Sequence, residues 1–117
     1  MDPSEMLRTK DLARNEPRAM DETLAGYAWL PRMIDKARAA DAGSLGDYVH
    51  PCPVDLRCLG LLRVEPMTFR EIASAARTGA EVVAALGRAG ARSAAEAWFD
   101  AVAFEEALMR GALAKSA

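Results

Sequence analysis

The sequence has very few of the side chains that most often carry chemistry. It contains one histidine and two cysteines, and aromatic residues make up 6% of the chain. Two cysteines are too few for a disulfide scaffold, and a single histidine leaves little scope for metal binding or acid–base catalysis. A phosphate-binding glycine loop, a His-Glu-x-x-His zinc helix and a serine nucleophile elbow are also missing. We therefore expect no metal and no cofactor, and the composition favours a protein that is not an enzyme.

Long apolar runs and a strong net charge are missing too. No apolar run approaches the roughly 20 residues that a membrane-spanning helix needs. The first residues, MDPSEMLRTKDL, lack the basic-then-apolar order of an export signal. The net charge is −2, which demands neither a nucleic acid nor an anionic membrane as partner. We expect a cytoplasmic protein with reduced cysteines, no membrane partner, and nucleic acid as a disfavoured one.

What is present fits one folded helical domain. The chain has 117 residues, of which 51% are apolar and 27% charged. Residues 1–28 show no sustained period and contain Pro3, Pro17 and Gly26, so we expect a turn-rich arm that packs on the rest. No alternating run indicates a strand. The sequence predicts an all-α fold in which 1–117 form a compact single domain of about five helices.

The helix starts and stops can be placed from local signals. Apolar residues recur at helical spacing from Leu30, and Gly43 ends that helix. Pro53 is expected to open the next helix, with Cys52 as its N-cap and Asp55 at N3. This second helix, over 54–62, is apolar nearly all round, which predicts that it is the central, buried one.

Three capping boxes are expected to open the remaining helices. Each pairs a hydroxyl residue with a glutamate three positions later: Thr68 with Glu71, Thr78 with Glu81, and Ser93 with Glu96.

Two blocks of sequence resemble a known family. The run from Leu24 to Arg38, LAGYAWLPRMIDKAR, is followed by GSLGDY at 43–48 and CPVD at 52–55. These blocks are similar to the small bacterial family called domain of unknown function 5069, and Asp11-Leu12, Pro17-Arg18 and Trp98 also sit where that family's pattern would put them. The likeness covers most of the chain and is densest from 24 to 55. It implies a compact helical domain and no known activity.

The stretch GDYVHPCPVDLRC, residues 46–58, concentrates the rare side chains. Zinc could in principle use His50, Cys52, Asp55 and Cys58, but the spacing is not a known zinc pattern, and a cap residue, a core thiol and a loop histidine explain the same residues. Cys52 at a helix N-terminus is also a candidate reactive thiol, against the simpler role of a cap. A Cys52–Cys58 disulfide is not expected, because the intervening helix turn separates the two residues.

Charged residues near this stretch could form a ligand site. Arg32 and Lys36 are like charges at i, i+4, an arrangement that calls for acids or an anionic ligand. Arg57 on the apolar second helix is expected to be partly buried and paired with Asp35, Asp47 or Asp55. The alternative is an internal salt-bridge lattice that pins the loop. The candidate ligand-binding residues are Arg32, Asp35, Lys36, Asp47, Tyr48, His50, Asp55 and Arg57.

The sequence therefore favours a module that binds a small polar or anionic ligand, or a protein partner, near residues 46–57. Residues 68–90 imitate a helix-turn-helix, which keeps DNA binding open as a rival; their spacing departs from that motif and their second helix offers few base-reading side chains. A small enzyme that uses the same loop is a third reading. A homodimer through Trp29 or the C-terminal helix is a further prediction.

Overall fold

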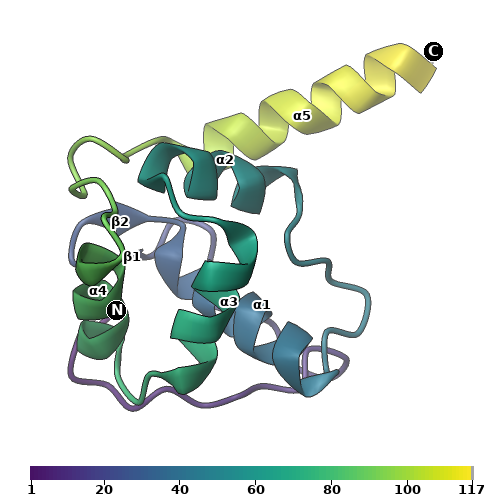
Figure 1. Ribbon diagram of the computed structural model, residues 1–117. Helices are drawn as coiled ribbons and strands as arrows, with labels where there is room; N and C mark the ends of the chain where they lie inside the picture. The colour runs from purple at the N-terminus through teal and green to yellow at the C-terminus, as the bar shows by residue number, and fades with distance from the viewer. Residues whose placement is uncertain (117) are drawn as a thin grey trace.

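The structure, a computed structural model, describes the backbone of residues 1–116 and the side chains of residues 1–111. It is mostly helical, with one small antiparallel sheet. The elements are β1 (Thr23–Leu24), β2 (Tyr27–Ala28), α1 (Leu30–Ala42), α2 (Pro53–Leu62), α3 (Pro66–Ala75), α4 (Gly79–Arg88) and α5 (Ala101–Ser116). Figure 1 shows α1 to α4 gathered into one body, from which α5 extends outward.

The all-α prediction was too simple, because β1 and β2 form a hairpin inside the N-terminal arm. Thr23 pairs with Ala28, and Leu24 pairs with Tyr27. The two turn residues between the strands, Ala25 and Gly26, have φ values of 50° and 83°. Two positive φ angles match the twist that a two-residue hairpin requires. Strands of two residues are too short to produce an alternating pattern, which is why the sequence did not reveal them.

The central helix is α1, so the prediction that the helix over 54–62 is central was wrong. Eight of the 13 residues of α1 are buried, and α3 packs along it. On α2, by contrast, Leu56 is 50% exposed. α1 can be buried on several faces because its alanines are small and its charged residues Asp35 and Lys36 are paired inside the protein. On α2, some apolar side chains, such as Leu56, have no neighbouring element to cover them.

Proline marks the start of three helices. α1, α2 and α3 each have proline in the first helical turn, where the missing N–H leaves no carbonyl unpaired. The predicted box at Thr68 was therefore wrong: α3 begins earlier, at Pro66, with Glu65 as N-cap. Thr78 does cap α4, since its hydroxyl accepts a hydrogen bond from Glu81 N at 3.2 Å.

The predicted start of the last helix at Ser93 was also wrong. Ser93 Oγ accepts a hydrogen bond from Glu96 N at 3.3 Å, but the residues that follow form only a turn. α5 begins at Ala101, and Asp100 Oδ1 accepts from Ala103 N at 3.0 Å. A capping box satisfies only its own donors, so it stabilises a turn equally well when no buried apolar face follows.

The first half of the arm crosses the helical body and forms backbone hydrogen bonds with it near α4 and after α1. Leu7 N donates to Arg77 O, Ala80 N donates to Pro3 O, and Leu12 N donates to Ser44 O, each at 2.8 Å. Leu7 and Leu12 are both buried. These contacts hold the arm beside α1, where it supplies charged side chains to the site described below.

Candidate functional site

A buried polar cluster joins α1 to the first turn of α2. The Lys36 ammonium donates to Asp55 Oδ2 at 2.8 Å, and Trp29 Nε1 donates to Asp55 Oδ1 at 2.7 Å. Lys36 is 3% exposed and Asp55 is fully buried. Both oxygens of the carboxylate are thus bonded, which offsets the cost of removing two charges from water.

Cys52 completes this cluster as the N-cap of α2. Its sulfur accepts from Asp55 N at 3.4 Å, and Asp55 Oδ2 accepts from Cys52 N at 2.9 Å, so the predicted cap is confirmed as a reciprocal box. Lys36 Nζ lies 3.1 Å from the same sulfur. Cys52 is half-buried, whereas burial raises the pKa of the Cys58 thiol to about 12, and Asp55 adds to the rise.

His50 lies in an apolar setting beside this cluster. It is 6% exposed, its ring centroid is 6.2 Å from that of Phe69, and neither ring nitrogen has a hydrogen-bond partner among the described residues. Burial lowers the pKa of His50; Lys36 and Arg70 lower it further, while Asp55 opposes them. The imidazole is therefore neutral near pH 7.

Arg32 of α1 contacts Trp29 and also Tyr48, which belongs to the loop before α2. Its guanidinium carbon lies 5.5 Å from the centroid of the Trp29 ring and 5.6 Å from that of Tyr48, and Nη1 donates to Arg18 O at 3.1 Å. Tyr48 and Asp47 border a shallow hollow of about 320 Å³ against the arm. Arg32 thus contacts two aromatic rings and a carbonyl group, while its Nε is buried without a hydrogen-bond partner among the described residues.

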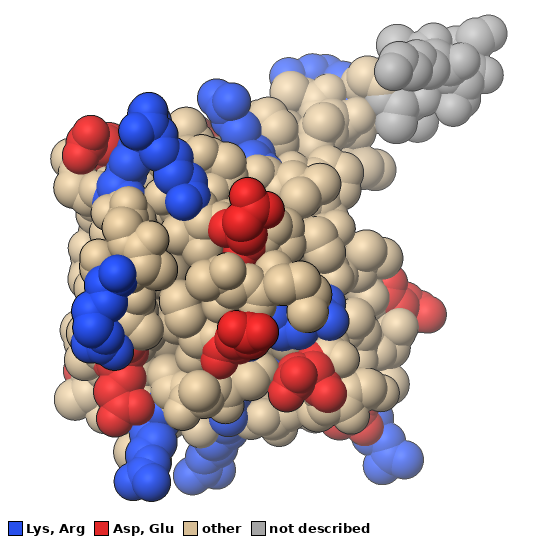
Figure 2. Space-filling model, viewed as in Figure 1, with Lys and Arg blue, Asp and Glu red and all other residues tan. Residues whose placement is uncertain are grey.

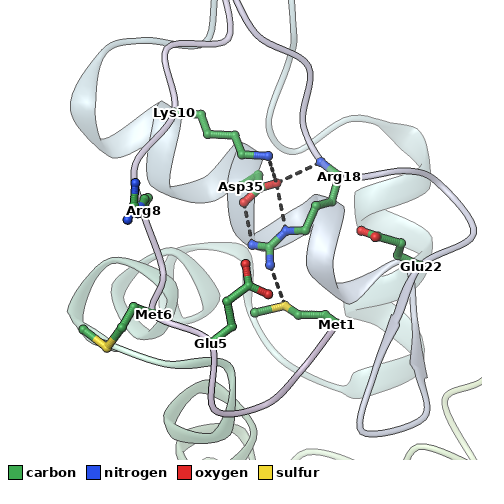
Figure 3. Close-up of a pocket in the computed structure, with 8 residues that line it drawn as sticks. All are labelled: Met1, Glu5, Met6, Arg8, Lys10, Arg18, Glu22 and Asp35. Atoms are coloured by element: carbon green, nitrogen blue, oxygen red, sulfur yellow. Dashed lines mark hydrogen bonds and ion pairs between the residues drawn. The ribbon is translucent and has the colours of Figure 1, made fainter.

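Asp35 lies on a different side of α1, against the arm. It accepts from Arg18 Nη2 at 2.6 Å, from Arg18 Nε at 3.1 Å and from Arg18 N at 2.8 Å, and Lys10 Nζ lies 3.3 Å from its Oδ2. Figure 3 shows these bonds converging on the carboxylate. Two cations therefore share one buried acid.

A cavity of about 490 Å³ opens beside this group. Glu5 and Glu22 contribute carboxylates to its wall, and the remaining donor nitrogen of Arg18, Nη1, faces the sulfur of Met1 at 2.7 Å (Figure 3). Oε2 of Glu22 is buried without a hydrogen-bond partner among the described residues. The cavity is lined by Met1, Glu5, Met6, Arg8, Lys10, Arg18, Glu22 and Asp35.

The predicted site residues therefore do not form one pocket. Lys36, Asp55 and Cys52 form an internal cluster, Arg32 packs with Tyr48, and Asp35 faces the arm. The prediction for Arg57 was wrong: it is exposed, and its guanidinium lies 5.7 Å from the ring centroid of Phe104. Because it points away from the core, Arg57 needs no buried acid.

Sequence reasoning missed the residues that complete the cavity. Arg18, Lys10 and Glu22 lie in the aperiodic arm, so no helical spacing relates them to Asp35. The signal that could have identified Arg18 was its place in the Pro17-Arg18 pair. The role of Trp29 as a donor to Asp55 was also missed, and at 2% exposed it cannot serve as the predicted dimer face.

The described part of the chain was also compared with what a metal site, a membrane span and a DNA-binding surface require. No group of three or more His, Cys, Asp or Glu side chains lies together there as metal ligands. None of its helices combines the length and apolar character needed to cross a membrane. α3 and α4 are joined by a three-residue turn, and Figure 2 shows charges of both signs interspersed over the face that they present.

Comparison with known proteins agrees with the resemblance noted in the sequence. No curated protein matches the chain. A family model does match, over residues 14–109, which include α1 to α4 and half of α5. The matched range contains Arg18, Asp35, Lys36 and Asp55, and excludes the first 13 residues of the arm. The chain belongs to the family described as domain of unknown function (DUF5069).

Proposed function

We propose that this protein binds a small molecule that carries both an ammonium group and a carboxylate, in the cavity between the arm and α1. The observation that carries the proposal is the buried, unpaired carboxylate oxygen of Glu22 in the same cavity as the Arg18 guanidinium. A volume of about 490 Å³ lies within the usual range for small-molecule sites. The proposal keeps the predicted class of ligand and moves its site from residues 46–57 to the arm.

The cationic side of the cavity is Arg18. Its Nε and Nη2 are held by Asp35, which fixes the plane of the guanidinium. Its Nη1 bonds only to the thioether of Met1, which is a weak acceptor. A ligand carboxylate in place of the Met1 sulfur would form a charge-assisted hydrogen bond, which is about twice as strong as a neutral one.

The anionic side is Glu22, with Glu5 nearby. Lys10 and Arg18 are already paired with Asp35, and no ion pair with Glu22 or Glu5 is present among the described residues. A buried acceptor that lacks a partner costs roughly 1–3 kcal/mol, and more if it is charged. A ligand ammonium would remove that cost. The ligand class that satisfies both sides is a small zwitterion, such as a free amino acid.

The loop at 46–57 offers less to a small ligand. Lys36 and Asp55 satisfy each other, and the Arg32 guanidinium already contacts the Trp29 and Tyr48 rings, although its Nε has no partner among the described residues. This arrangement supports the alternative of an internal lattice that pins the loop. We propose a bacterial cytoplasm as the setting, which agrees with two free thiols.

The test is an amide NMR titration with the standard L-amino acids, tried first as a pool and then singly. Arg18 N donates to Asp35, so its signal should report ligand binding at that guanidinium. Acetate and methylamine serve as half-ligands with one charge each. We expect an amino acid to shift this signal at concentrations where neither half-ligand does. Shifts that acetate reproduces at equal concentration, or no shift with any amino acid, would contradict the proposal.

A matched pair of variants locates the site. Glu22→Gln removes the unpaired charge, and Asp21→Asn removes an exposed charge one residue earlier. We expect Glu22→Gln to weaken binding at least about tenfold, the equivalent of 1.4 kcal/mol, while thermal stability is unchanged or higher. Asp21→Asn should bind like the wild type. Equal affinities in all three proteins would place the ligand elsewhere.

A further inference from the structure

The extended backbone at the start of the arm determines which of its charges face the cavity. Met6 forms an isolated antiparallel bridge to the N-cap residue of α4 and is 61% exposed, whereas Leu7 is buried. Side chains alternate between the two faces of an extended chain. Glu5 therefore lies on the inward face, as Leu7 does, while Arg8 lies on the outward face. In Figure 3 the Glu5 carboxylate points toward Arg18, and Arg8 lies at the edge of the cavity.

The charges that face the cavity do not cancel. Asp35 is shared by Arg18 and Lys10, so these three residues together carry one positive charge. Glu5 and Glu22 each add a negative charge, and neither forms an ion pair among the described residues. Apart from the arginine at the edge, the wall therefore has one negative charge in excess. Because charges interact more strongly where a ligand displaces water, this wall favours a ligand with one positive charge in excess.

We propose that the preferred ligand is an amino acid with a cationic side chain, such as lysine or ornithine, and that Glu5 selects it. This inference rests on the proposed function, in which Arg18 Nη1 binds the ligand carboxylate and Glu22 its α-ammonium group. Glu5 then accepts hydrogen bonds from the side-chain ammonium. The two acids come from different parts of the arm and approach Arg18 from different directions, as Figure 3 shows. They can thus bind the two cationic ends of one ligand.

Ligands with other side chains use the cavity less well. An acidic side chain would bring a further carboxylate toward Glu5 and would find its one unpaired cation, Arg8, only at the edge of the cavity. An apolar side chain would leave Glu5 solvated and would gain nothing from it. The expected preference is moderate, because Glu5 is exposed and exposed ion pairs contribute little.

The test is the same amide NMR titration, now with two matched ligands. L-norleucine has the carbon chain of L-lysine without the terminal ammonium group. We expect the wild type to bind lysine about threefold to tenfold more tightly than norleucine. L-glutamate should bind more weakly than norleucine, because its side chain repeats the charge of Glu5.

A pair of variants assigns the preference to one residue. Glu5→Gln removes the inward-facing carboxylate and should bind lysine and norleucine equally. Glu16→Gln removes an exposed carboxylate of the same arm that does not line the cavity, and it should keep the preference for lysine. The amide spectrum of each variant without ligand shows that it is folded.

The outcomes separate this inference from the proposed function. Equal binding of lysine and norleucine by the wild type, or tighter binding of glutamate, overturns the inference and leaves the proposed function standing, because an amino acid still binds. A preference for lysine that survives Glu5→Gln overturns the role of Glu5. No binding of any of the three amino acids at the Arg18 signal overturns both proposals.

Discussion

Lys36 of α1 and Asp55 of α2 form a buried ion pair whose ammonium and carboxylate are 2.8 Å apart. The same carboxylate accepts hydrogen bonds from the Trp29 indole and from the backbone of Cys52. One acid thus fixes the entry into α1, the start of α2 and the end of the loop between them. Its partners are too interdependent for their contributions to add.

The first prediction concerns this interdependence. Lys36→Met leaves Asp55 buried without a counter-charge, and Asp55→Asn leaves Lys36 in the same state, so each should cost about 3–5 kcal/mol of unfolding free energy. The double variant carries neither charge and should be more stable than the sum of the single effects by about 0.5–3 kcal/mol. Urea denaturation of the four proteins gives the coupling energy. Strictly additive costs would show that the two residues act separately.

The second prediction is a pH dependence from His50. Its pKa is lowered in the folded protein, so below about pH 6.5 the unfolded chain binds a proton that the folded protein does not. The stability that neutral His50 contributes should be fully present above that pH. It should be lost as the pH falls from there toward the pKa of His50 in the folded protein. His50 is the only histidine, and the ordinary carboxyl pKa values lie near 4. His50→Leu should therefore remove the slope between pH 6.5 and pH 5.5; a slope that persists would assign it to another group.

The third prediction separates the two thiols. Cys52 is half-buried at the surface end of α2, whereas Cys58 is 2% exposed and has a pKa raised to about 12. Iodoacetamide at pH 8 should therefore label Cys52 in the folded protein and reach Cys58 only after unfolding. Peptide mass spectrometry assigns the label. Equal labelling of the two residues in the native state would contradict the burial of Cys58.

The fourth prediction compares two glycines of one loop. A Cβ at Gly46 would lie 2.7 Å from Ala13 Cα and 2.9 Å from Leu12 O, whereas one at Gly43 meets nothing within 4 Å. Both residues have positive φ, at 58° and 72°. Gly43→Ala should cost about 1–2 kcal/mol for the left-handed backbone alone, and Gly46→Ala about 1–3 kcal/mol more, because the arm must move. Equal unfolding free energies would show that the arm yields freely at Ala13.

The sequence predicted elements whose signals are local. The helix from Leu30 to Ala42 and the cap at Cys52 follow from apolar spacing, proline and glycine within a few residues. The start of α3 was missed although Pro66 repeats the signal seen at Pro31 and Pro53; a nearby threonine offered a competing cap that the helix does not use. Where a proline and a possible capping residue lie within three residues of each other, the local sequence alone does not show which of them begins the helix.

The site was harder to predict because its contacts are long-range. Asp35 could have paired with several cations, and its choice of Arg18 depends on how the arm crosses α1. The central position of α1 had the same cause: an apolar stripe indicates one buried face, but the arm buries a second, charged face through ion pairs. Neither arrangement follows from the periodicity of one segment.

The way the arm bonds to the helical body also affects how fast the protein folds. Mostly helical domains are usually among the fast folders because their contacts are local. Here the bonds of Leu7 to Arg77 and of Ala80 to Pro3 tie residues 3–7 to the turn before α4 and to its first turn, so loop closure over most of the chain must precede them. During synthesis the residues from Pro3 to Leu7 have no docking surface until the start of α4 has left the ribosome, whereas Leu12 can already bond to Ser44 after α1. Leu7 stays exposed through that interval, which makes the start of the arm the segment through which unfinished chains would associate.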